Sequence, residues 1–191
     1  MSDLVDRAVA ELVGYLSDAS NAEPSRTFPR EPSRAEHPGL YAWWADDEAL
    51  AMLSMSFGED LSPLIYAGQT GATSTRSLTR RSTTLGSRIG GSHLNGNVAS
   101  STFRETLTAV LLEPMSLRLV EARRLDEASN RAVSTWMRCH LRVAIVPVDD
   151  RDRLAAMEQA VLERLDPPLN LMGMTPTTAR TMLRQLRAIL K

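Results

Sequence analysis

One glutamate lies on the apolar side of an otherwise regular amphipathic helix. Residues 153–165 have helical spacing, and on a helix that advances about 100° per residue Leu154, Met157, Val161 and Leu165 form one stripe. Glu158 falls inside this stripe. A carboxylate that faces an apolar surface is unfavourable unless it is paired with a cation, hydrogen-bonded or bound to a metal. An ion pair with an arginine is the ordinary structural explanation, and metal coordination is the functional one.

Two of the three tyrosines, Tyr41 and Tyr66, lie in short apolar runs that are typical of strands, HPGLYAWW and PLIYAGQT. Taken singly, each is an ordinary strand aromatic. A tyrosine that acts as a base needs help, because a pKa of about 10 leaves only about 0.1% ionised at neutral pH, and its surroundings must supply roughly 4 kcal/mol. Nearby cations or a proton-accepting histidine could supply it. His93 is the histidine that lies among basic and glycine-rich residues.

The basic charge is concentrated in one segment. Residues 62–104 contain five arginines and no Asp or Glu, so the other 148 residues sum to −6 in a chain of net charge −1. These arginines are Arg76, Arg80, Arg81, Arg88 and Arg104. The pattern is typical of a localised phosphate-binding surface, with a solvated helix face as the alternative. Lysine occurs only at Lys191, which excludes a Walker-type phosphate loop and an internal Schiff-base lysine.

The patterns around these residues predict a mixed α/β domain. Short apolar runs bounded by turn-forming or charged residues predict strands over 39–45, 63–68 and 141–148. Helices are predicted over 3–17, 77–94 with a break near Gly90-Gly91, 102–112, 125–137, 153–165 and from Thr175 onward. The stretch 18–38 is predicted to be a loop, and 46–60 a helical turn or a hairpin arm.

Length and composition indicate one soluble domain. With 191 residues, 43% of them hydrophobic, the chain can bury one substantial core. No apolar run reaches 18 residues, and the N-terminus lacks the pattern of a secretion signal, so we expect neither membrane insertion nor export. The single Cys139 can form no internal disulfide, and no Cys/His cluster has zinc-ligand spacing. We therefore expect a cytoplasmic protein.

In this order and spacing, the motifs resemble those of the GIY-YIG nuclease family. The resemblance covers roughly residues 38–172 and rests on Gly39-Leu40-Tyr41, Tyr66-Ala67-Gly68, Arg88 with His93, and Glu158 twelve residues before Asn170. It implies a small, central, mostly antiparallel three-stranded sheet flanked by helices, with DNA as the partner. The catalytic group that it implies comprises Tyr41, Tyr66, Arg88, His93, Glu158 and Asn170. Glu158 would bind one divalent ion, and Mg²⁺ or Mn²⁺ suits a carboxylate with few other protein ligands.

Two features depart from the family pattern. This chain has Gln69 after the second tyrosine, where many members have a lysine, and Arg88 and His93 are five residues apart instead of one helical turn. The residues expected to contact DNA are Gln69, Arg76, Arg80, Arg81 and Arg104. We expect residues 1–37 to form an N-terminal helix and loop, 38–172 the catalytic domain, and 173–191 a C-terminal helix packed on the same domain.

The leading hypothesis is a metal-dependent DNA endonuclease with a role in restriction or defence. Its specificity is expected to come from its own loops and terminal helices or from a partner protein, and a restriction enzyme is expected to form a homodimer to cut both strands. The alternative is a non-catalytic nucleic-acid-binding module that retains the fold, which Gln69 and the Arg88–His93 spacing leave open. An acyl hydrolase that uses Ser92 or Ser101 with His93 is poorly supported, because no Gly-x-Ser-x-Gly elbow is present.

Overall fold

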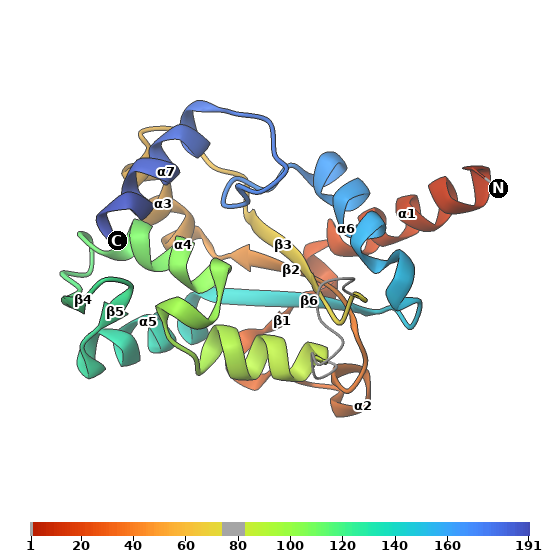
Figure 1. The fold of residues 1–191 in the computed structure, drawn as a ribbon, viewed down its shortest axis with the longest axis horizontal. Helices are drawn as coiled ribbons and strands as arrows, with labels where there is room; N and C mark the ends of the chain where they lie inside the picture. Colours follow the sequence, from red (N-terminus) through yellow and green to blue (C-terminus); the bar gives the residue numbers. More distant parts are fainter. Residues whose placement is uncertain (1, 74–82) are drawn as a thin grey trace.

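A four-stranded antiparallel sheet lies at the centre of the computed structural model, which describes residues 2–73 and 83–191 (Figure 1). Its strand order is β1-β6-β2-β3, with β1 Glu23–Pro24, β2 Gly39–Ala45, β3 Leu64–Thr70 and β6 Leu141–Pro147. The three predicted strands are confirmed, as is a small antiparallel sheet flanked by helices. The two-residue β1 was not predicted, because residues 18–38 contain no alternating apolar pattern; it pairs with β6 through Glu23 and Val143.

The two faces of the sheet carry separate hydrophobic clusters. Because side chains alternate along a strand, Tyr41 and Trp43 project to one face, and Leu40 and Ala42 to the other. The first face is covered by α3 (Asp47–Phe57), η3 (Ser87–Leu94), α4 (Thr102–Leu111), α5 (Glu127–His140) and α7 (Thr178–Ile189). The second face is covered by α1 (Ser2–Leu16) and α6 (Arg151–Leu165), which lie together in Figure 1.

Shorter elements connect this framework. They are η1 (Ala19–Asn21), η2 (Ser25–Thr27), α2 (Pro32–Ala35), η4 (Val98–Ser100) and a small hairpin of β4 (Leu119–Glu121) and β5 (Arg124–Leu125). No helix in the described part of the chain has the length and apolar character needed to cross a membrane.

Three helix predictions need correction. Residues 47–57 form the regular helix α3, which begins at the N-cap Asp46, whose carboxylate accepts the Ala49 N–H, and ends at Gly58 in the left-handed conformation. Gly90-Gly91 does not break η3, which passes through both residues as a π-helix with an Asn95 N–H to Gly90 C=O bond of 3.0 Å. Finally, α7 begins at Thr178 and not near Thr175, because Thr177 Oγ1 is the N-cap that accepts the Arg180 N–H.

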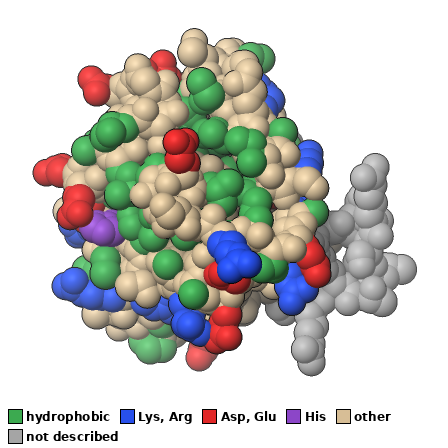
Figure 2. Space-filling view, turned by 90° about the vertical axis from the view of Figure 1, so that its left-hand side faces the viewer, with side chains coloured by type: hydrophobic (Ala, Val, Ile, Leu, Met, Phe, Trp, Pro, Cys, Tyr) green, Lys and Arg blue, Asp and Glu red, His purple; other side chains and the backbone are tan. Residues whose placement is uncertain are grey.

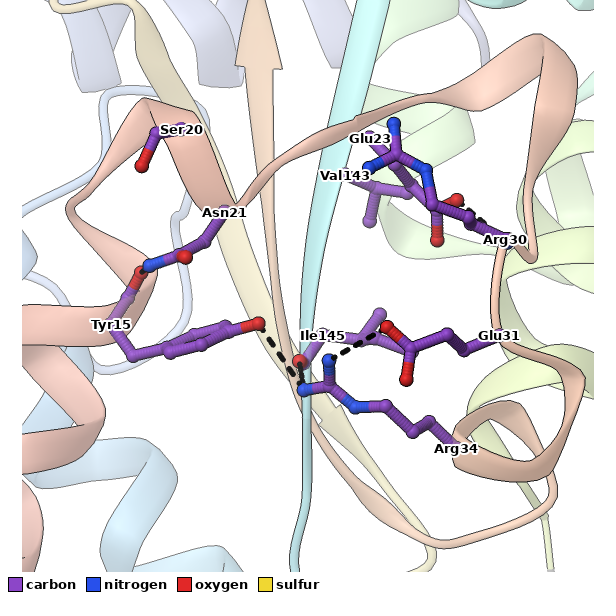
Figure 3. Close-up of a pocket in the computed structure, with 9 residues that line it drawn as sticks. All are labelled: Tyr15, Ser20, Asn21, Glu23, Arg30, Glu31, Arg34, Val143 and Ile145. Atoms are coloured by element: carbon purple, nitrogen blue, oxygen red, sulfur yellow. Dashed lines mark hydrogen bonds and ion pairs between the residues drawn. The ribbon is translucent and has the colours of Figure 1, made fainter.

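The outer edge of β6 is closed by side chains where β1 ends (Figure 3). Arg34 of α2 donates from Nη2 to the Ile145 carbonyl at 2.9 Å and to Tyr15 Oη at 3.2 Å. Pro147 has no N–H to offer. A polar pocket of about 160 Å³ remains at this edge, and it contains none of the predicted site residues. These contacts protect the edge strand from pairing with another chain.

The left-hand side of Figure 1, which carries α3, α7 and the β4–β5 hairpin, mixes side chains of all kinds (Figure 2). The large exposed apolar residues of these elements are Met55, Val120, Met182 and Ile189. Charged side chains of both signs lie between and around the apolar ones in Figure 2. This face therefore does not form the one-sign basic surface that binds phosphates.

A buried carboxylate fixes α7 and the β4–β5 turn to α4. Helix α4 is buried along Phe103–Leu111, and the side chain of Glu105 is only 4% exposed. Glu105 accepts hydrogen bonds from Arg187 Nη2 at 2.5 Å and from Arg123 Nη2 at 3.2 Å, and Arg123 Nε lies 3.1 Å from its carboxylate. Two cations therefore compensate one buried anion, and removal of the anion leaves both cations without a counter-charge.

Glu105→Ala should lower the free energy of unfolding by about 2–3 kcal/mol, because it leaves a buried site with uncompensated arginines. Urea unfolding monitored by circular dichroism measures this. Glu127→Ala, which removes only an exposed ion pair with Arg131, is the matched control and should cost much less. Equal effects of the two variants would contradict the structural role of Glu105.

Candidate active site

The β2–β3 ladder brings the two tyrosines to one face of the sheet. Tyr41 lies opposite Gly68, and Trp43 lies opposite Tyr66. Residues two apart on a strand share a face, so both phenols project toward α4, where the Tyr66 ring packs 4.6 Å from Phe103. A Cβ atom on Gly68 would lie 2.8 Å from Tyr41 Oη. The glycine of the second motif therefore gives the Tyr41 phenol room to lie across β3.

His93 lies behind Tyr41 and is fully buried. Its Nε2 is 3.0 Å from Tyr41 Oη, and its Nδ1 is 2.5 Å from Ser101 Oγ. The ring meets Trp43 and Phe103 edge-on. Burial, with smaller effects from the Arg88 and Arg104 charges, lowers the pKa of His93 well below its usual value. The imidazole is therefore neutral, and its ring hydrogen-bonds to Tyr41.

The π-helix compensates for the five-residue separation of Arg88 and His93. In a helix with i→i+5 hydrogen bonds, residues five apart lie one turn apart, as residues four apart do in an α-helix. Both side chains reach the same phenol, because Arg88 also hydrogen-bonds to Tyr41. The π-helix thus places Arg88 and His93 one turn apart, although their spacing in the sequence differs from the family pattern.

Arg88 is half-buried, and its Nε–H donor is without an acceptor in the described part of the chain. Burial raises the pKa of Tyr41, and the positive charge of Arg88 opposes this rise. Burial also raises the pKa of Tyr66 strongly, so this phenol remains protonated.

Glu158 is half-buried on α6, beside the same cluster. Among the described residues, no cation lies within ion-pair distance of its carboxylate, so the ordinary structural explanation for an inward glutamate is not observed. Burial raises the pKa of Glu158 to about 6, although a hydrogen bond from the Gln69 backbone N–H and the charge of Arg88 oppose this. A desolvated carboxylate without a paired cation is a suitable ligand for a hard metal ion.

The outer edge of β3 positions both Glu158 and Asn170. The Asn170 side chain accepts the Ala67 N–H at 3.0 Å and donates to the Ala67 carbonyl at 2.8 Å. Two residues further along the same edge, the backbone N–H of Gln69 donates a hydrogen bond to Glu158. Asn170 therefore acts as a positioning residue, because both ends of its amide bind backbone.

Arg180 of α7, which was not among the predicted site residues, holds the Asn170 segment. Its buried guanidinium donates to the carbonyls of Asn170 at 2.9 Å and Pro167 at 3.0 Å and pairs with Asp166 at 2.7 Å. The sequence offered one signal: Arg180 precedes Leu183 by three positions and so shares the apolar face of the terminal helix.

The prediction that Arg104 contacts DNA is wrong. The side chain is fully buried, donates to the carbonyls of His93 at 2.9 Å and Asn130 at 2.7 Å, and also binds Ser134. Burial lowers its pKa to about 10. Arg104 therefore joins η3 to α5 inside the protein and cannot reach a phosphate.

The other predicted DNA contacts divide into two groups. Gln69 lines a cleft of about 230 Å³ together with Arg88 and Ser92, and its side-chain Oε1 accepts the Ala72 N–H at 3.2 Å. Arg76, Arg80 and Arg81 lie outside the residues that the structure describes. Arg88 and Gln69 are thus the residues that connect this cleft to the buried cluster.

Comparison with known proteins identifies a family for this chain. A model of the GIY-YIG catalytic domain matches residues 39–189, which extends from β2 to the end of α7. No curated protein and no solved structure matches. The match contains the whole cluster of Tyr41, Tyr66, Arg88, His93 and Glu158, and most of the chain. The chain belongs to the GIY-YIG nuclease family.

Proposed function

We propose that this protein is a metal-dependent endonuclease that hydrolyses DNA phosphodiester bonds. The observation that carries the proposal is the convergence of Tyr41, Arg88 and Glu158, which come from a strand and two helices and interact with one another electrostatically. A base, a fixed positive charge and an unpaired carboxylate are the groups that phosphodiester hydrolysis requires.

Glu158 would hold the metal, Mg²⁺ or Mn²⁺. The described residues contain no cluster of three or more His, Cys, Asp or Glu side chains that could form an all-protein cage. One desolvated carboxylate fits these ions, since they retain waters and take phosphate oxygens as further ligands. When bound, such an ion neutralises charge on the scissile phosphate and on the leaving oxygen.

Tyr41 would act as the base. As the phenolate, its oxygen takes a proton from water, the water oxygen bonds to phosphorus, and the bond from phosphorus to the leaving oxygen breaks, so that the leaving oxygen carries away the negative charge. His93 would act through Tyr41, because its Nε2 lies 3.0 Å from Tyr41 Oη. Arg88 stabilises the phenolate and the charge that builds on the phosphate, and Tyr66 remains a protonated donor.

The acid-free segment 62–104 supports DNA as the substrate. Arg76, Arg80 and Arg81 would contact DNA phosphates. In the cytoplasm, a restriction role would call for cutting at chosen sites, with a second copy of the chain to cut the second strand or a partner protein to supply specificity. A defence nuclease could instead act as a monomer or within a complex. Sequencing the ends of digested genomic DNA separates discrete sites from scattered nicks.

Glu158→Gln should lower Mg²⁺-dependent plasmid cleavage at least about a hundredfold, because the neutral amide holds the ion poorly. Gel electrophoresis of plasmid over a time course measures this. Glu163→Gln, an exposed change on the same helix, is the matched control and should retain activity. Salt-sensitive DNA binding without cleavage by the wild type in any metal would favour the binding-module alternative.

Metal affinity should fall below about pH 6. The raised pKa of Glu158 means that protons compete with the metal in this range, so affinity should drop about tenfold per pH unit once the pH lies well below 6. Titration of Mn²⁺ by electron paramagnetic resonance between pH 5 and pH 8 checks this. Constant affinity down to pH 5 would contradict the assignment of Glu158.

Tyr41→Phe should lower the single-turnover rate by about 10²–10⁴ with DNA binding retained. Because burial raises the pKa of Tyr41, the phenolate fraction grows about tenfold per pH unit up to that pKa, and the wild-type rate should rise through pH 8 and pH 9. Tyr15→Phe, which removes only the hydroxyl that Arg34 contacts, is the matched control. A pH-independent wild-type rate would contradict a tyrosine base.

A further inference from the structure

One buried guanidinium holds the segment that follows α6. The side chain of Arg180 is only 2% exposed. Its nitrogens donate hydrogen bonds from Nε to the Asn170 carbonyl at 2.9 Å, from Nη1 to the Thr175 carbonyl at 3.0 Å, and from Nη2 to Asp166 Oδ1 at 2.7 Å and the Pro167 carbonyl at 3.0 Å. All of these acceptors lie within residues 166–175, so one side chain fixes the path of this segment.

The end of α6 and this segment together line the outer edge of β3. The Ile65 carbonyl accepts an N–H of the segment, the Asn170 amide binds both backbone groups of Ala67, and the Gln69 N–H donates to Glu158. The three strand residues are two apart, so their backbone groups project from the same edge. The chain from Glu158 to Asn170 thus occupies the position of a neighbouring strand.

Arg180 contacts this arrangement at two points. Asp166 is the left-handed C-cap of α6, about two helical turns beyond Glu158, and Asn170 binds the middle of the β3 edge. Glu158 belongs to α6 and Gln69 to β3, so a shift at either point changes the distance between the carboxylate and the Gln69 N–H. A lysine would keep the positive charge, but its one nitrogen cannot replace three guanidinium nitrogens whose acceptors lie in different directions.

We propose that Arg180 is a positioning residue for the metal site, because it fixes α6 and the edge of β3 so that Glu158 stays against the Gln69 N–H. Arg180 acts through Asp166 and Asn170 and needs no contact with the substrate. A residue that only stabilised the fold would protect both edges of β3 equally, whereas a positioning residue protects the outer edge in particular.

Amide hydrogen exchange followed by NMR tests this positioning without metal or DNA. In Arg180→Lys, exchange at the outward amides of Ala67 and Gln69 should accelerate about tenfold relative to the Gly68 amide, which faces β2. Arg34→Lys is the matched control, because Arg34 donates to a β6 carbonyl at the opposite side of the sheet, and it should leave this ratio unchanged. Equal acceleration of all three amides in Arg180→Lys, or an unchanged ratio, would overturn the proposal.

A second variant keeps the test decisive if Arg180→Lys does not fold. Asp166→Asn weakens one ion pair of Arg180 at an exposed carboxylate and retains a residue type that the left-handed conformation tolerates. It should raise the same exchange ratio by a smaller factor. A wild-type ratio in Asp166→Asn, with Arg180→Lys unfolded, would also count against the proposal.

Manganese binding tests the consequence for the metal site, and this part rests on the proposed function. Electron paramagnetic resonance should show an Mn²⁺ affinity about tenfold lower in Arg180→Lys, in line with other groups that orient metal ligands, and unchanged in Arg34→Lys. Plasmid cleavage at saturating metal should fall much less than the affinity does. Wild-type Mn²⁺ affinity in Arg180→Lys would overturn the role at the metal site, whereas a wild type that binds no Mn²⁺ but shows the expected exchange pattern would refute only the metal proposed for Glu158.

Discussion

The backbone groups on the free edge of β3 must find hydrogen-bond partners, and the site depends on which groups take that role. The strand lies at the end of the sheet, so its outward N–H and C=O groups have no neighbouring strand. The Ile65 carbonyl accepts the Leu169 N–H, Ala67 is bound by Asn170, and the Gln69 N–H is bound by Glu158. The inner edge of the same strand pairs with β2 and aligns the tyrosines. One strand therefore brings the carboxylate and both phenols together.

Burial of polar groups is the second constraint. His93 and Arg104 lie among aromatic and aliphatic side chains, where an unsatisfied donor is costly, so their hydrogen bonds extend through Ser101, Asn130 and Ser134. This network fixes the imidazole against Tyr41 within a close-packed core. The proposed base therefore has a rigid hydrogen-bond partner. Arg104, which belongs to the basic segment of the sequence, is buried in this network and cannot contact DNA.

The terminal helix α7 belongs to the architecture of the site and is not a peripheral addition. Arg180 fixes the segment that carries Asn170, and Arg187 joins α7 to the buried Glu105 of α4. The family match likewise runs to residue 189. Residues beyond 172 thus contribute to the alignment of β3.

The sequence by itself determined the type and order of the main elements, because strong periodicity and turn residues fix local structure. It also predicted Tyr41, Tyr66, Arg88, His93, Glu158 and Asn170 as site residues from their order along the chain. Only the tertiary structure decided that Arg104 is internal and that a π-helix brings Arg88 and His93 to one phenol. It alone also showed that Asn170 hydrogen-bonds to the edge of β3 and that Arg180 holds Asn170 in place. Burial and hydrogen-bond partners depend on contacts between distant segments, and charge or spacing along the chain does not encode them locally.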